Sequence, residues 1–148
     1  MLVVLGVWLV VAVGFFAYRW TAAISADPRL SVRGIRLGMT ADDVRSRVDE
    51  MGPGGWTSRL DRGDWVLEHD APNETSSFEL HEGQLVAIRY EAPADADLAA
   101  GPEFEMTRGS VLTRHLEGGR VRITLLSRDC PTHHEEAEQL VAAHATSP

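Results

Sequence analysis

Apolar residues form one unbroken run at the start of the chain, and periodic patterns replace it afterwards. Residues 2–18 carry no charged side chain. As a helix they would rise about 26 Å, close to the ~30 Å hydrocarbon layer of a bilayer. The pattern predicts a single-pass transmembrane anchor, residues 1–20, whose apolar span begins at Leu2 and ends near Trp20. A cleaved signal peptide is the alternative, although the run lacks a basic start.

A strong helix start follows in residues 34–44, GIRLGMTADDV. Thr40 is a preferred N-cap residue, and Asp43 stands at the third helical position, where its carboxylate can accept a hydrogen bond from the N-cap amide. The Gly-Pro pair at 52–53 would end this helix. The segment before it, residues 21–33, lacks periodicity and is predicted to be a tether.

Alternating apolar and polar residues follow this helix, and short turns that contain Gly divide them. Such turns favour positive φ angles and therefore β-hairpins. Hairpin turns are predicted at residues 61–64, 81–83 and 117–119. Because alternation places the apolar side chains on one side, we expect a sheet with one buried face and one wet face. Residues 91–103 are rich in Ala, Asp and Pro and are predicted to be an exposed acidic loop.

The last pattern, residues 133–144, has helical spacing. Thr132 and Glu135 would form a second capping box at its start, and the apolar side of this helix would cover the sheet. The predicted fold class is therefore α+β, with two helices packed on an antiparallel sheet of about four to six strands. The predicted domain covers residues 34–148 and ends in a short disordered tail.

The charge of the chain narrows the choice of partners. The 148 residues allow one ordinary domain, and 22 acidic against 14 basic residues give a net charge of −8 at pH 7. An acidic domain is repelled by phosphate backbones, which argues against nucleic acid as a partner. Cys130 is the single cysteine of the sequence, so the chain cannot form a disulfide within itself.

Residues 34–48, GIRLGMTADDVRSRV, resemble the I-x-L-G-M-[TS]-x-x-[DE]-V opening of small envelope domains. These are the SmpA/OmlA family of outer-membrane assembly lipoproteins and the β-lactamase inhibitory proteins, in which the motif starts a helix that packs on a short antiparallel sheet. The resemblance implies a non-catalytic protein-binding or assembly accessory module of the bacterial cell envelope, with its domain outside the cytoplasm. The arginines after the apolar run would instead favour a cytoplasmic domain.

The sequence contains no catalytic motif of the common kinds. It has no G-x-S-x-G, no H-E-x-x-H and no glycine-rich phosphate loop. We therefore expect no enzyme, no catalytic residues and no cofactor. An alternative is a zinc- or copper-binding domain that uses Cys130 and His133, with His134 beside them, because thiolate and imidazole suit these metals. A small-ligand sensor domain is the second alternative.

The expected partner is another membrane or envelope protein, since an anchor raises the effective concentration of a neighbour in the membrane. Trp side chains are enriched at binding hot spots, and an acidic loop would favour a basic patch on the partner. Core packing of at least one Trp is the competing interpretation. The candidate partner-binding residues are Trp56, Trp65, Glu91, Asp95, Asp97 and Glu103.

Overall fold

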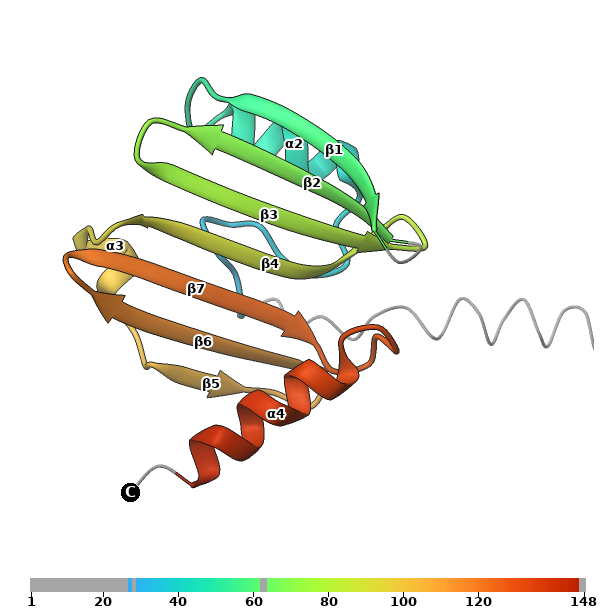
Figure 1. Ribbon diagram of the computed structural model, residues 1–148, viewed down its shortest axis with the longest axis vertical. Coiled ribbons are helices and arrows are strands. Elements are labelled where there is room, and N and C mark those ends of the chain that lie inside the picture. The colour runs from blue at the N-terminus through green and yellow to red at the C-terminus, as the bar shows by residue number, and fades with distance from the viewer. Residues whose placement is uncertain (1–26, 28, 62–63, 147–148) are drawn as a thin grey trace, which may run out of the picture.

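The computed structural model describes residues 27, 29–61 and 64–146 (Figure 1). Its elements are, in chain order, α2 (Ala41–Asp49), β1 (Gly55–Asp61), β2 (Asp64–Ala71), β3 (Glu74–His81), β4 (Gln84–Pro93), α3 (Ala96–Ala99), β5 (Phe104–Met106), β6 (Ser110–Glu117), β7 (Arg120–Ser127) and α4 (His134–Ala145). Residues 147–148, at the end of the predicted disordered tail, lie outside the described residues.

The strands form one antiparallel sheet in the order β1-β2-β3-β4-β7-β6-β5. The three predicted hairpins are confirmed, because β1 pairs with β2, β3 with β4, and β6 with β7. A fourth hairpin, β2 with β3, was not predicted. Its turn contains Asn73, whose φ of 68° is a left-handed conformation that Asn tolerates better than most residues.

The predicted α+β class, with two helices on about four to six strands, is wrong. The described chain is mainly β, with a seven-stranded sheet and three short helices of 9, 4 and 12 residues. Strand pairing extends β4 as far as Pro93, into the predicted loop. Helix α3 lies within that loop, and β5 begins directly after the loop and gains its hydrogen bonds from β6. Unpaired backbone N–H and C=O groups at the edge of a sheet favour pairing with a neighbouring segment of the chain. The local sequence of that segment does not show that it will pair.

The prediction of a single-pass membrane protein with a domain outside the cytoplasm is corrected as well. Within the described ranges, no helix is long and apolar enough to cross a membrane. Helix α4, with 12 residues, is the longest of them and would rise only about 18 Å, against the ~30 Å of a bilayer interior. The apolar run between Leu2 and Trp20, on which the prediction rested, lies outside the described residues.

The predicted start of α2 is confirmed. The Thr40 hydroxyl accepts from the Asp43 amide at 3.3 Å, and the Thr40 amide donates to the Asp43 carboxylate at 3.2 Å. These two bonds satisfy amides that have no partner inside the helix. The hydrogen bonds from Thr40 also hold the pKa of Asp43 below its usual value. Val44 and Val48 are fully buried and point from α2 to the sheet.

The two faces of the sheet carry separate apolar clusters. Because successive side chains of a strand point to opposite faces, neighbours such as Leu125 and Leu126 belong to different clusters. The larger cluster contains Leu125 and the buried residues of α2, and it includes Leu30 and Val32 from the segment before α2. The smaller cluster contains Leu126 and Ala137 of α4. Helices α2 and α4 therefore cover opposite faces (Figure 1).

Helix α4 covers the sheet as predicted, but it does not begin with the predicted capping box. Its N-cap is His133, which makes no side-chain capping bond. A tight turn replaces the Thr132–Glu135 box, since the Cys130 carbonyl accepts from the amides of His133 at 3.1 Å and His134 at 2.9 Å. The turn frees the His133 side chain to point toward the sheet.

Candidate functional site

The sheet face on the α4 side is only partly covered. Helix α4 packs on β6 and β7, and none of the other described elements lies over the strands beyond it (Figure 1). We call the uncovered area over β1, β2, β3, β4 and β7 the open face. Strand register places these polar side chains on it: Thr57, Arg59, Glu68, Asp70, Thr75, Ser77, Arg89, Glu91, Arg120, Arg122 and Thr124.

A hollow of about 370 Å³ lies in the open face between β2, β3, β4 and β7. Its acidic lining residues are Glu68, Asp70 and Glu91, and its basic ones are Arg89 and Arg122. Glu68 and Asp70 come from β2, whereas Arg122 comes from β7, two strands beyond β3. The hollow thus has an acidic side and a basic side.

Glu91 holds the arginines of β7 in place. Its carboxylate accepts from Arg120 Nε at 2.8 Å and from Arg122 Nε and Nη2 at 3.3 Å each. The hydrogen bonds from Arg120 and Arg122 hold the pKa of Glu91 below its usual value. Arg120 also donates to the Asn73 carbonyl at 3.2 Å and so connects β7 with the β2–β3 turn. Arg120 and Arg122 are therefore positioned before any partner arrives.

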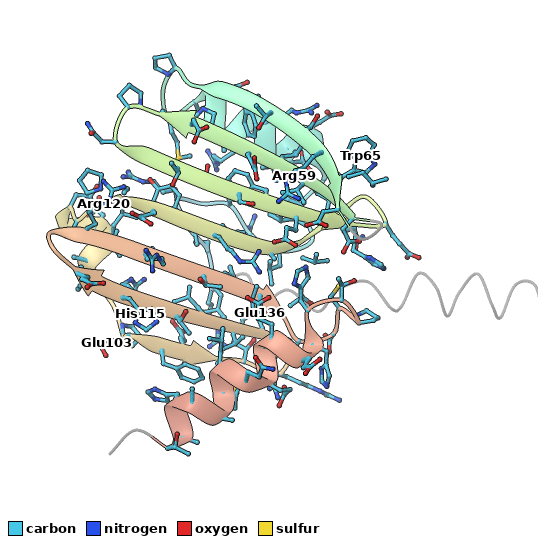
Figure 2. The ribbon with its side chains drawn as sticks, viewed as in Figure 1. Arg59, Trp65, Glu103, His115, Arg120 and Glu136 are labelled. Carbon is cyan, nitrogen blue, oxygen red and sulfur yellow. The ribbon has the colours of Figure 1, made fainter. Side chains whose placement is uncertain are left out.

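A second ionic group, which we call the anchor cluster, joins the open face to the start of α4. It consists of Glu79, Arg89, His133 and Glu136. Arg89 pairs with Glu79 and donates to the two Glu136 carboxylate oxygens at 3.0 and 2.8 Å. His133 Nε2 lies 3.2 Å from a Glu79 oxygen, and its Nδ1 lies 3.6 Å from Glu136. Glu136 marks this point on α4 in Figure 2.

The anchor cluster has the properties of a structural tie. His133 is buried, and burial, reinforced by the Arg89 guanidinium, lowers its pKa from the ordinary value. The imidazole is therefore neutral at neutral pH. A buried neutral histidine between two carboxylates can hold a helix to a sheet, but it has little access to a substrate from solution. In a neighbouring pair, His81 Nδ1 lies 2.5 Å from Asp64 Oδ1, and the Asp64 side chain is buried.

The two candidate tryptophans have different environments. Trp65 is 56% exposed, and Figure 2 shows it at the end of the β1–β2 hairpin, away from Arg120 and His115. Trp56 is half-buried and donates from Nε1 to Asp49 at 2.9 Å, and its ring lies 4.9 Å from that of His69. Trp56 belongs to the core, so the structure does not combine the two into one surface.

The four candidate acidic residues also lie apart. Glu91 faces the open face, whereas Asp95 caps α3 by accepting from the Leu98 amide at 2.7 Å. This backbone hydrogen bond is the main reason why the pKa of Asp95 is lowered. Asp97 lies in α3 and Glu103 precedes β5, and both are exposed. The predicted acidic loop is thus divided among β4, α3 and the segment before β5, and its acidic residues form no single patch.

The metal-binding alternative gains no support from the geometry. Cys130 is buried, the nitrogens of His133 face carboxylates, and His134 Nδ1 lies 2.8 Å from the Arg128 carbonyl on the surface. The three side chains do not converge. Over the described ranges, no group of three or more His, Cys, Asp or Glu residues is arranged to hold a metal ion.

Sequence reasoning missed the arginines and Glu79 of the open face. The available signal was alternation: Arg89 and Glu91 share one side of β4, as do Arg120 and Arg122 in β7. That signal identifies the polar side of each strand. It does not show that β4 lies next to β7, which is what brings Glu91 to the two arginines.

Comparison of the chain with protein-family models, with curated proteins and with solved structures gave no match. The resemblance of residues 34–48 to envelope domains therefore stays a prediction from one motif.

Proposed function

We propose that this chain is a non-catalytic protein-binding module that presents the open face of its sheet to a partner. The observation that supports the proposal is the uncovered row of paired charges around the hollow. Arg120 and Arg122 are already held by Glu91, and Arg89 is held by Glu79 and Glu136. Side chains fixed in this way lose less entropy on association, so they suit a recognition surface.

The charge arrangement of the open face describes the partner. Glu68 and Asp70 give the β2 side an acidic character, and the arginines of β7 give the other side a basic one. A complementary protein surface would carry both signs in the reverse order, which would fix its orientation on the sheet. The motif resemblance of residues 34–48 supports protein binding as well, although it does not identify the partner.

The test is photo-crosslinking in the cells from which the chain derives. A photoreactive residue in place of Thr124, in the hollow, should capture a defined protein, whereas the same residue in place of Ser46, exposed on α2, should not. Arg122→Glu places a second carboxylate beside that of Glu91, and it should abolish the capture from position 124. Arg45→Glu, an equal change of charge on exposed α2, should leave it unchanged. Equal capture from both positions, or capture that survives Arg122→Glu, would contradict the proposal.

A small-ligand sensor is the second candidate function, and the volume of the hollow is the observation that favours it. Its volume of about 370 Å³ is at the lower end of the ~300–1,000 Å³ range of ligand pockets. Ligand pockets are mostly apolar, whereas five charged residues line this one. Ligand binding would raise the thermal midpoint of the purified chain, and the Arg122→Glu variant would lose that shift while Arg45→Glu keeps it.

A further inference from the structure

Strand β1 is an edge of the sheet, and among the described strands it pairs only with β2. Its seven residues, GWTSRLD, contain no Pro and no Lys and pair with β2 without a bulge. Pro, Lys and β-bulges are common means of protecting an edge strand, because its unpaired N–H and C=O groups can otherwise recruit another strand. The opposite edge, β5, has only three residues. Among the described strands, β1 is therefore the longer edge, and its residues 55–60 carry a single charged side chain, Arg59.

Exposed apolar side chains lie next to this edge. Leu60 is 62% exposed and Trp65 is 56% exposed, and they are directly opposite each other in the β1–β2 pair. Trp65 in turn lies opposite Leu80, a buried core residue, so this row is on the α2 side of the sheet. A further strand beside β1 would cover Leu60 and shield Trp65 from water.

We propose that β1 pairs antiparallel with β1 of a second copy of this chain, so that two sheets join into one. The pairing is centred on Ser58, which lies opposite Ser58 of the second copy. A two-fold axis relates the copies, so each contact between unlike residues occurs twice. This surface lies at the sheet edge and borders the hollow of the open face, with which it shares Glu68.

The strand's own sequence selects this register. When a residue lies opposite its own copy, the α2 sides of both sheets form one continuous side. If the second strand is shifted by one residue, the apolar row of each copy lies beside the polar row of the other. Centring on Ser58 pairs all seven residues of β1. Thr57 then lies opposite Arg59, and no two like charges meet. Centring on Arg59 would place two guanidinium groups opposite each other, which is unfavourable.

Self-complementarity points to a second copy as the occupant. In the Ser58-centred register, Leu60 lies opposite Trp56 of the second copy, whose side chain packs against the core and is only partly exposed in one copy alone. On the other side of the sheet, Arg59 of the second copy lies next to Thr57, and Glu68 lies on the far side of Thr57. Apolar surface therefore meets apolar surface, and a guanidinium approaches a carboxylate, in both halves of the pair.

Disulfide crosslinking of the full chain tests the register. Directly opposite residues of antiparallel strands have Cα atoms ~4.5–5.5 Å apart, within the ~4.4–6.8 Å of a disulfide. Ser58→Cys should therefore give a covalent dimer under mild oxidation, while the native Cys130 stays buried. His115→Cys, exposed on β6, is the matched control. The rest of the chain is the same in the His115→Cys and Ser58→Cys variants. Association through some other surface would therefore give no specific advantage to crosslinking at Ser58→Cys.

A second variant tests the contact itself. Leu60→Lys in the Ser58→Cys background places a charge on the edge and should lower the dimer yield about tenfold or more. Leu116→Lys changes a leucine of similar exposure, 52%, on β6 and should leave the yield unchanged. Both leucines are exposed, so unchanged unfolding midpoints will show that the fold is intact. The proposal is overturned if Ser58→Cys crosslinks no better than His115→Cys, or if Leu60→Lys has no effect.

Discussion

At the scale of single residues, close approach and burial decide which changes the fold tolerates. A Cβ atom at Gly54 would lie 2.1 Å from His69 Nε2 and 2.9 Å from the Asp70 carbonyl, far inside normal contact. His69 is buried on the sheet, so it has little room to move. The adjacent Gly55 has its nearest such neighbour, the same carbonyl, at 4.0 Å.

We therefore expect Gly54→Ala to lower the free energy of unfolding by about 1–3 kcal/mol, the usual cost of overpacking. Gly55→Ala should change it little or raise it slightly, because Ala loses less backbone entropy on folding. Urea unfolding of both variants measures the difference. Equal midpoints for the two variants would show that the chain at Gly54 adjusts without strain.

His133 makes the stability depend on pH. Its pKa in the folded chain is lowered from 6.5 by burial and by Arg89, so the unfolded chain binds a proton at a higher pH than the folded chain does. Stability from this residue is therefore complete above pH 6.5 and falls as the pH drops toward the folded pKa. His133→Gln should lose less stability than the natural chain between pH 7.5 and 5.5, as measured by urea unfolding. Parallel pH curves would contradict this expectation.

At the scale of the elements, the helix ends carry contacts that can be tested separately. Thr40→Ala removes the side-chain cap of α2 and should cost about 1 kcal/mol of unfolding free energy. Ser46→Ala, exposed within the same helix, is the control and should leave stability unchanged or slightly higher, since Ala is the better helix former. An unchanged midpoint for Thr40→Ala would mean that the cap adds nothing measurable.

The anchor cluster should decide how firmly the start of α4 is held. Arg89→Met removes the guanidinium that joins Glu79 to Glu136. Because the Arg89 side chain is 37% exposed, we expect a loss of about 1–2 kcal/mol rather than the full cost of a buried pair. Hydrogen exchange should accelerate in the first turns of α4. Arg59→Met, which breaks a more exposed pair on β1, should leave α4 exchange unchanged.

At the scale of the whole molecule, the apolar row of the β1 edge and the arginines of β7 lie on opposite sides of the sheet and should act independently. Leu60→Lys should lower the yield of the β1-paired dimer without changing photo-crosslinking from Thr124. Arg122→Glu should abolish photo-crosslinking from Thr124 without changing the dimer yield. Leu60 lies on the α2 side of β1 and Arg122 on the other side of the sheet in β7, and effects at sites without shared contacts are normally additive. Loss of both signals in either variant would show that the partner binds only the paired form.

The sequence by itself determined the local features. The Thr40–Asp43 cap and the Gly-containing turns need only neighbouring residues, so motif chemistry identified the start of α2 and three hairpins. Alternation likewise showed that one side of the strands is polar. The sequence did not determine the fold class, because strand pairing adds β5 and extends β4. Its prediction of a single-pass membrane protein is not supported by the described residues, none of whose helices could span a bilayer.

Only the tertiary structure decided how these local pieces combine. β4 pairs with β7 across α3, β5 and β6, and this pairing brings Glu91 to Arg120 and Arg122. The turn at Cys130 places α4 on the face opposite α2 and brings His133 to Glu79. Such contacts join residues that are 29 to 54 positions apart in the chain. Local propensity carries no information about contacts at that separation. Burial of apolar side chains and the pairing of backbone hydrogen-bonding groups in the complete sheet determine them.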